Sequence, residues 1–177
     1  MTKKLLLLTI LVPLFCAAAE PPTRGPVIEE YGPVFPVEQT DPLTGTESFK
    51  ISFDMVDMGK PDKVNGKIES LARFLNMHAR AGVKPGNIRL ALVSHGNSGF
   101  SLLNDEQYRA KYGRANPNTP LINELLKHQV RIIICGQSAA HHGIANDHLH
   151  PGVEVALSAM TAHALLQQQG YTLNPPS

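Results

Sequence analysis

The segment that most constrains the fold spans residues 129–144, where an uninterrupted apolar run meets small and polar residues. The run Ile132-Ile133-Ile134 leads directly into Cys135 and Gly136. An apolar run without polar alternation is typical of a strand buried on both faces of a parallel sheet. Gly136 ends this strand, and residues 137–142 predict a helical turn. The pattern therefore places Cys135 at the carboxyl edge of a central strand, where open α/β sheets bind their ligands.

Cys135 has two interpretations on local sequence alone. The amino end of a following helix carries a partial positive charge that favours a thiolate, which predicts a reactive cysteine. A buried cysteine also occurs commonly as a small apolar side chain with no chemical role. The local sequence leaves both interpretations open.

Residues 1–19 predict a secretory signal peptide. Two lysines precede the apolar residues 5–15, a run too short for an ordinary transmembrane helix, and Ala17-Ala18-Ala19 fits a cleavage site before Glu20. We expect export to a bacterial periplasm, with no membrane attachment after cleavage. Cleavage removes Cys16, so Cys135 would be the single cysteine of the mature chain. An unpaired cysteine in an oxidising compartment modestly favours a chemical role.

Composition excludes nucleic acid as an expected partner. The chain has 16 Lys and Arg against 15 Asp and Glu, a net charge of +1, without runs of one sign. A nucleic-acid-binding surface needs a concentration of basic residues. Trp is absent, which argues against a stacking platform for bases or sugars.

The mature chain is long enough for one domain, preceded by a proline-rich arm. Residues 20–47 contain six prolines and predict an extended segment anchored by apolar side chains, which are Val27, Ile28, Tyr31, Val34 and Phe35. Residues 48–177 form the predicted domain. Strands are expected at 48–55, 87–96, 129–135, 153–157 and, as a short edge strand, 171–173; helices are expected at 64–82, 105–112, from 119 and at 158–169. This alternation predicts a parallel-rich α/β sheet with helices on both faces.

His95 is the first candidate partner of Cys135. It ends the strand that precedes the Cys135 strand, so in a parallel sheet the two residues lie on the same edge. An imidazole near a thiol stabilises the thiolate or moves its proton. The alternative is a histidine that only satisfies a loop backbone.

A second group of histidines follows Cys135. His141, His142 and His148 are the candidates for a metal site, with His150 and Asp147 in the same segment. Their spacing fits no compact zinc pattern, so solvated loop histidines are the simpler interpretation, and we expect no cofactor. The nucleophile elbow Gly-x-Ser-x-Gly, the phosphate-binding loop and the dinucleotide fingerprint are all absent from the sequence.

Two runs resemble the DsrE/DsrF-like family: Ile-Ile-Cys-Gly-Gln-Ser at 133–138 and Pro-Gly-Val-Glu-Val-Ala-Leu-Ser-Ala-Met-Thr at 151–161. The likeness spans roughly residues 49–173, including the strand end Val-Ser-His-Gly at 93–96, and is greatest to exported members with a signal peptide and an arm. It implies a three-layer α/β/α domain with a mostly parallel sheet of about five strands, assembled into oligomers. In cytoplasmic members a cysteine at the strand end carries sulfur as a persulfide between partner proteins, and Cys135 matches that position.

The combined expectation is a periplasmic, homo-oligomeric sulfur carrier. Cys135 would accept sulfane sulfur and pass it on to a partner protein, with His95 as proton partner. The backbone after the thiol, at Gly136, Gln137 and Ser138, would stabilise the anion. Such a sulfur carrier or sulfurtransferase holds a covalent cysteine persulfide intermediate, and turnover as a free-standing enzyme is not implied. The alternatives are an oligomeric binding module for a metal or small ligand at the His-rich loop, and an interaction protein that uses its arm.

Overall fold

A five-stranded sheet with the strand order β4-β3-β2-β1-β5 organises the chain. The computed structural model describes residues 20–174, so the predicted signal peptide lies outside the described residues. Every pair of neighbouring strands is parallel, which confirms the predicted α/β fold class with its parallel sheet. The strands are β1 (Phe49–Met55), β2 (Ile88–Ser94), β3 (Arg131–Cys135), β4 (Val153–Ala156) and β5 (Thr172–Asn174).

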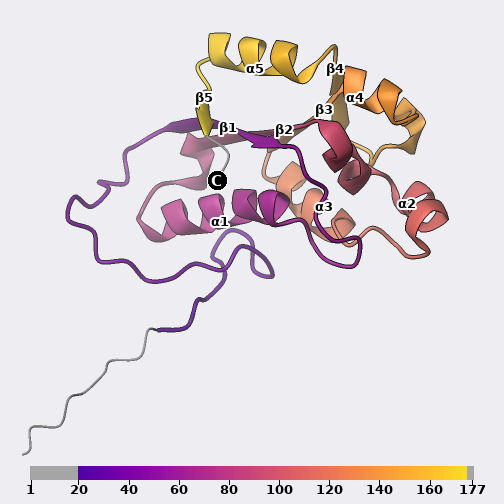
Figure 1. Ribbon diagram of the computed structural model, residues 1–177. Helices are drawn as coiled ribbons and strands as arrows, with labels where there is room; N and C mark the ends of the chain where they lie inside the picture. Colours follow the sequence, from indigo (N-terminus) through magenta and orange to yellow (C-terminus); the bar gives the residue numbers. More distant parts are fainter. Residues whose placement is uncertain (1–19, 175–177) are drawn as a thin grey trace, which may run out of the picture.

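Helices cover both faces of this sheet and make the three layers (Figure 1). Helices α1 and α3 lie on one face, and α5 lies on the other. The helices are α1 (Gly66–Arg80), α2 (Asp105–Tyr112), α3 (Thr119–Lys127), α4 (Gly136–His141) and α5 (Ala159–Gln168). Short 3-10 segments are η1 (Pro85–Asn87), η2 (Gly96–Leu102) and η3 (Asn146–His148). The strand expected at 87–96 ends at Ser94, and Gly96–Leu102 forms the 3-10 segment η2.

Helices α1, α2 and α5 begin where side chains cap their free N–H groups. Asn65 accepts from the N–H of Lys67 at the start of α1, and Ser158 accepts from the N–H of Thr161 at the start of α5. In α1, buried side chains recur at helical spacing, which gives the helix one apolar face. Those buried apolar residues are Ile68, Leu71, Ala72 and Leu75.

The two faces of the sheet bury very different amounts of apolar surface. Leu92, Ile132 and Ile134 point into the large core beneath α1 and α3. The alternate positions point the other way, where a small cluster packs beneath α5. That cluster consists of Ala91, Val93, Ile133, Ala162 and Leu166. The α5 layer therefore rests on a narrow apolar contact.

The arm at residues 20–47 contains no helix, and its one β-bridge joins Thr23 to Val34. Ile28 is 2% exposed and packs into the core, whereas Phe35, expected as an anchor, is 57% exposed. The arm lies close against α1 at Gly32, where an added Cβ would stand 2.3 Å from the N atom of Arg73. Gly32 also has a φ of +66°, a conformation that favours glycine. Both the close approach and the backbone conformation therefore require glycine at this position.

The buried amide of Asn76 helps to hold the arm in place. The Oδ1 atom of Asn76 accepts from the N–H groups of Val27 (3.1 Å) and Ile28 (2.9 Å). Its Nδ2 group donates to the carbonyls of Ile28, Tyr31 and Gly32 at 2.9–3.2 Å. Asn76 is fully buried, so it replaces water as the partner of these backbone groups.

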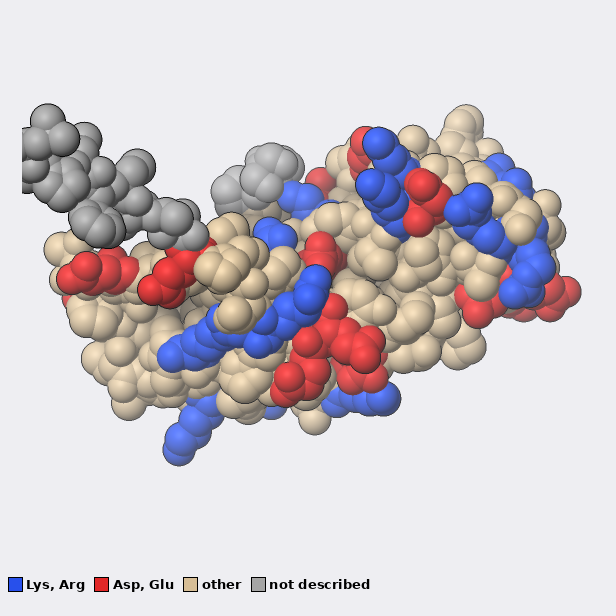
Figure 2. All heavy atoms as spheres, turned by 90° about the horizontal axis from the view of Figure 1, so that it is seen from below, with Lys and Arg blue, Asp and Glu red and all other residues tan. Residues whose placement is uncertain are grey.

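Charge is mixed on the face seen from below. Lys and Arg side chains lie beside Asp and Glu there, separated by uncharged areas (Figure 2). Within residues 20–174, no helix is both long and apolar enough to cross a membrane.

Replacing Asn76 tests how the arm is held. Asn76→Ala leaves several buried N–H and C=O groups without partners, so we expect the free energy of unfolding to fall by about 2–3 kcal/mol. Urea unfolding followed by circular dichroism measures the change. Asn123→Ala, the same exchange at an exposed position of α3, is the control. A loss for Asn76→Ala no larger than the control would contradict this role of Asn76 in holding the arm.

Candidate functional site

Three titratable side chains share the α5 face at the carboxyl ends of β1, β2 and β3. Val93 and Ile133 pack beneath α5, so two positions further on His95 and Cys135 lie on that same face. Asp54 stands between Phe53 and Met55, which both point into the opposite core. The α5 face therefore carries Asp54, His95 and Cys135 on three adjacent strands.

The register makes His95 and Cys135 lateral neighbours. The last paired residues of β2 and β3 are Ser94 and Ile134, and His95 and Cys135 each follow directly. Adjacent strands are about 4.8 Å apart. The predicted proximity of the two residues thus follows from strand pairing.

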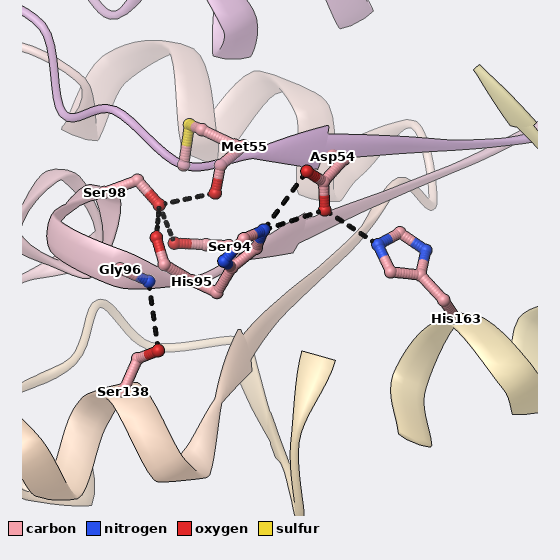
Figure 3. Close-up of polar contacts among 8 residues, drawn as sticks. All are labelled: Asp54, Met55, Ser94, His95, Gly96, Ser98, Ser138 and His163. Atoms are coloured by element: carbon pink, nitrogen blue, oxygen red, sulfur yellow. Dashed lines mark hydrogen bonds and ion pairs between the residues drawn. The ribbon is translucent and has the colours of Figure 1, made fainter. Parts of the chain in front are cut away.

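Hydrogen bonds fix the backbone around His95. Its N–H donates to the Met55 carbonyl at 2.9 Å. The buried hydroxyl of Ser98 lies 2.7 Å from the carbonyl oxygens of Met55 and His95 and from the Ser94 hydroxyl (Figure 3). Segment η2 is thereby fastened to the end of β1, which limits how far His95 can move.

The Asp54 carboxylate lies between two imidazoles. Its two oxygens are each 3.1 Å from Nε2 of His95, and Oδ1 is 2.8 Å from Nε2 of His163 on α5 (Figure 3). Burial acts to raise the pKa of Asp54, but the hydrogen bonds and charges of His163 and His95 outweigh it and lower that pKa. Asp54 is therefore an anion at neutral pH that accepts from both rings.

Cys135 is buried, with 5% of its surface exposed, and donors from two helix starts act on its sulfur. Burial acts to raise the pKa of the Cys135 thiol. The hydroxyl of Ser138 and the backbone N–H groups of Ser138, Ala159 and Gln137 overcome that effect, so the pKa is lowered. These donors come from the starts of α4 and α5, which both meet at the sulfur.

The residues after Cys135 have separate roles in this geometry. Gln137 and Ser138 supply donors to the sulfur, and the Ser138 hydroxyl also accepts from the N–H of Gly96 at 3.0 Å (Figure 3). Gly136 makes room instead, because a Cβ there would stand 2.6 Å from the Ala156 carbonyl oxygen. Ser138 thus links the loop after His95 to the thiol.

The histidine-rich segment does not gather around a common point. His141 and His142 stack edge to face with ring centroids 5.0 Å apart, and His148 accepts from the N–H of Ala145 at 3.4 Å. Across residues 20–174, no three His, Cys, Asp or Glu side chains form a group suited to a metal ion. The metal-binding alternative for His141, His142 and His148 therefore has no support in this geometry.

Asp54, His163 and Ala159 were not singled out from the sequence. Asp54 had a usable signal, since it is a carboxylate near the carboxyl end of the first predicted strand, at the same edge as His95. His163 and Ala159 had none, because their places depend on how α5 docks. Among residues 20–174, the hydrogen-bond partner of the His95 ring is Asp54. A direct contact of His95 with the thiol therefore stays a prediction.

Comparison with known proteins agrees with this architecture. The model of the DsrE/DsrF-like family matches residues 50–175. A solved structure, the protein of unknown function MTH1491 from Methanobacterium thermoautotrophicum, is 18% identical with a TM-score of 0.55 and aligns with 73% of this chain and 100% of its own. At that identity the likeness shows the shared fold alone. No curated protein matches the chain.

Removing the Ser138 hydroxyl tests the electrostatics of the thiol. In Ser138→Ala the sulfur loses one donor, so we expect the pKa of Cys135 to rise and its thiolate fraction at neutral pH to fall. The rate of alkylation by iodoacetamide, measured from pH 5 to pH 10, gives the inflection. Ser70→Ala on α1 is the control, and an unchanged inflection in Ser138→Ala would contradict this account of the site.

Proposed function

Because the chain belongs to the DsrE/DsrF-like family, we propose that its role in sulfur relay is to carry sulfane sulfur as a persulfide on Cys135. The observation that carries the proposal is the set of donors around this sulfur, from the starts of α4 and α5. They lower the pKa of a thiol that burial alone would raise. A thiolate is the nucleophilic form of cysteine, so this environment prepares Cys135 to attack another sulfur.

The transfer step balances without an external oxidant. The Cys135 thiol gives up its proton, and the thiolate attacks the terminal sulfur of a donor R–S–SH. The donor S–S bond breaks as a new S–S bond forms on Cys135, and R–S⁻ leaves and takes up the proton to become R–SH. Reversal toward an acceptor thiol of a partner protein would complete the relay.

The surrounding groups supply what this step requires. The N–H groups of Gln137, Ser138 and Ala159 stabilise the negative charge before attack. We propose His95 as the group that takes the thiol proton and returns it to the leaving sulfur, because the register places it beside Cys135. The single cysteine left after removal of residues 1–19 would work in the periplasm.

Replacing the nucleophile gives the direct test. The mature wild-type chain, incubated with sodium polysulfide, should gain the mass of sulfur on Cys135, and cyanide should remove that sulfur as thiocyanate. Cys135→Ser should gain none, because no other thiol is present in residues 20–177. Intact-mass spectrometry and a thiocyanate assay measure both steps.

Ser138→Ala is the matched variant in this experiment. It keeps the nucleophile and weakens only its stabilisation, so it should take up sulfur more slowly and reach the same final mass. Sulfur uptake by Cys135→Ser, or a wild-type chain that takes up none, would show that the proposed function is wrong.

A further inference from the structure

We propose that Asp54 and His163 are positioning residues that hold the His95 ring as a proton acceptor beside Cys135. This inference rests on the proposed persulfide chemistry. It goes beyond that chemistry by assigning work to a carboxylate and a second histidine that lie on β1 and α5. Neither residue is a donor to the Cys135 sulfur.

Asp54 decides which nitrogen of His95 carries the proton. Both carboxylate oxygens of Asp54 are 3.1 Å from Nε2 of His95. Because a carboxylate can only accept a hydrogen bond, Nε2 must carry the proton that is donated. A neutral His95 ring therefore carries its proton on Nε2 and has a free lone pair on Nδ1. In Figure 3 this second nitrogen points away from Asp54. His95 is thus prepared to accept a proton at Nδ1.

His163 holds the carboxylate in the orientation that this tautomer needs. Its Nε2–H donates to Oδ1 of Asp54 at 2.8 Å, a shorter contact than either one with His95. Both residues are well shielded, with side-chain exposures of 17% for His163 and 16% for Asp54. A carboxylate fixed by one imidazole offers a defined acceptor to the other.

The same hydrogen bond fastens α5 over the thiol. His163 lies one helical turn after Ala159, whose N–H is among the donors to Cys135. The apolar contact beneath α5 is small, so the bond from His163 to Asp54 helps to set the position of this helix, together with the hydrogen bonds of Gln169 at its other end. His163 therefore acts on the sulfur site twice, through Asp54 and through the start of α5.

The titratable groups that face Asp54 come from the elements packed around it. His95 follows β2, His163 belongs to α5, and Cys135 ends β3 on the same face. The ion pair of Arg131 with Glu154 lies at the opposite, amino end of β3. In the described part of the chain, the ion pairs of Asp54 are those with the two imidazoles.

The second ring nitrogen of His163, Nδ1, takes no part in the hydrogen bond to Asp54. This nitrogen is buried without a hydrogen-bond partner among the described residues. With the proton on Nε2, this atom is a buried acceptor without a partner, which is unfavourable relative to a paired one. A buried polar atom without a partner is often explained by a functional role of its residue. The unpaired Nδ1 atom is therefore consistent with a role of His163 in the site.

Three variants separate the parts of this arrangement. Asp54→Asn keeps the shape but offers an N–H as readily as an oxygen, so the tautomer of His95 is no longer imposed. His163→Leu removes the donor, and His163→Gln restores an N–H at a comparable place. His128→Leu, at the end of α3, is the control for replacing a half-buried histidine.

The experiment has two readouts on the whole mature protein, with folding checked by circular dichroism. Nitrogen-15 NMR of the histidine rings should show the wild-type His95 proton on Nε2, and a shift towards Nδ1 in Asp54→Asn. Sulfur uptake from sodium polysulfide at pH 7 should slow on the order of 10²-fold in Asp54→Asn and His163→Leu. His163→Gln should recover most of the rate, and His128→Leu should match the wild type.

Each result decides the inference separately from the proposed function. A wild-type His95 with its proton on Nδ1, or wild-type uptake rates in Asp54→Asn and His163→Leu, would overturn the positioning role while the persulfide chemistry stands. If the wild-type chain takes up no sulfur, the tautomer and the iodoacetamide rate of Cys135 still decide it. Slower alkylation in Asp54→Asn supports the role, and equal rates reject it. Should His163→Leu not fold, the nearly isosteric Asp54→Asn carries the test.

Discussion

Strict alternation of side chains along parallel strands in fixed register is the constraint on which the site depends. Three adjacent strands present Asp54, His95 and Cys135 to one face only because Val93 and Ile133 already point there. A slip of β3 by one residue would send the thiol into the opposite core and bring an isoleucine to the site. The apolar residues that specify this register therefore also specify the chemistry, although none of them touches the reacting sulfur.

Close approach of backbones is the second requirement. Helix α4 starts directly after Cys135, and α5 starts at Ala159, whose N–H also points to the sulfur, so free N–H groups of both helices converge on one atom. Such convergence needs β3 and β4 to stay close as they leave the sheet, and Gly136 allows this where any Cβ would collide with the Ala156 carbonyl. The arm follows the same principle at Gly32, so the chain places glycine where layers must nearly touch.

The elements of this fold were predictable to within a few residues, because buried parallel strands read as apolar runs and helices show their caps. The place of Cys135 followed from the strand end alone. Asp54 and His163 were missed because their pairing depends on how α5 lies across the sheet, which spacing along the chain does not encode. The amide of Asn76 and the exposure of Phe35 were missed for the same reason, since both depend on the path of the arm over α1.

The unequal packing of the two helical layers has a consequence for motion. Helix α5 rests on a small apolar cluster and on polar contacts at His163 and at its C-cap, Gln169, whereas α1 and α3 share the main core. Local unfolding begins where little surface is buried, so α5 should separate from the sheet at a lower free energy than the whole domain unfolds. Reagents would then reach the nearly covered Cys135 sulfur only when α5 separates locally from the sheet. A sulfur atom stored there would be shielded between openings from thiols in solution.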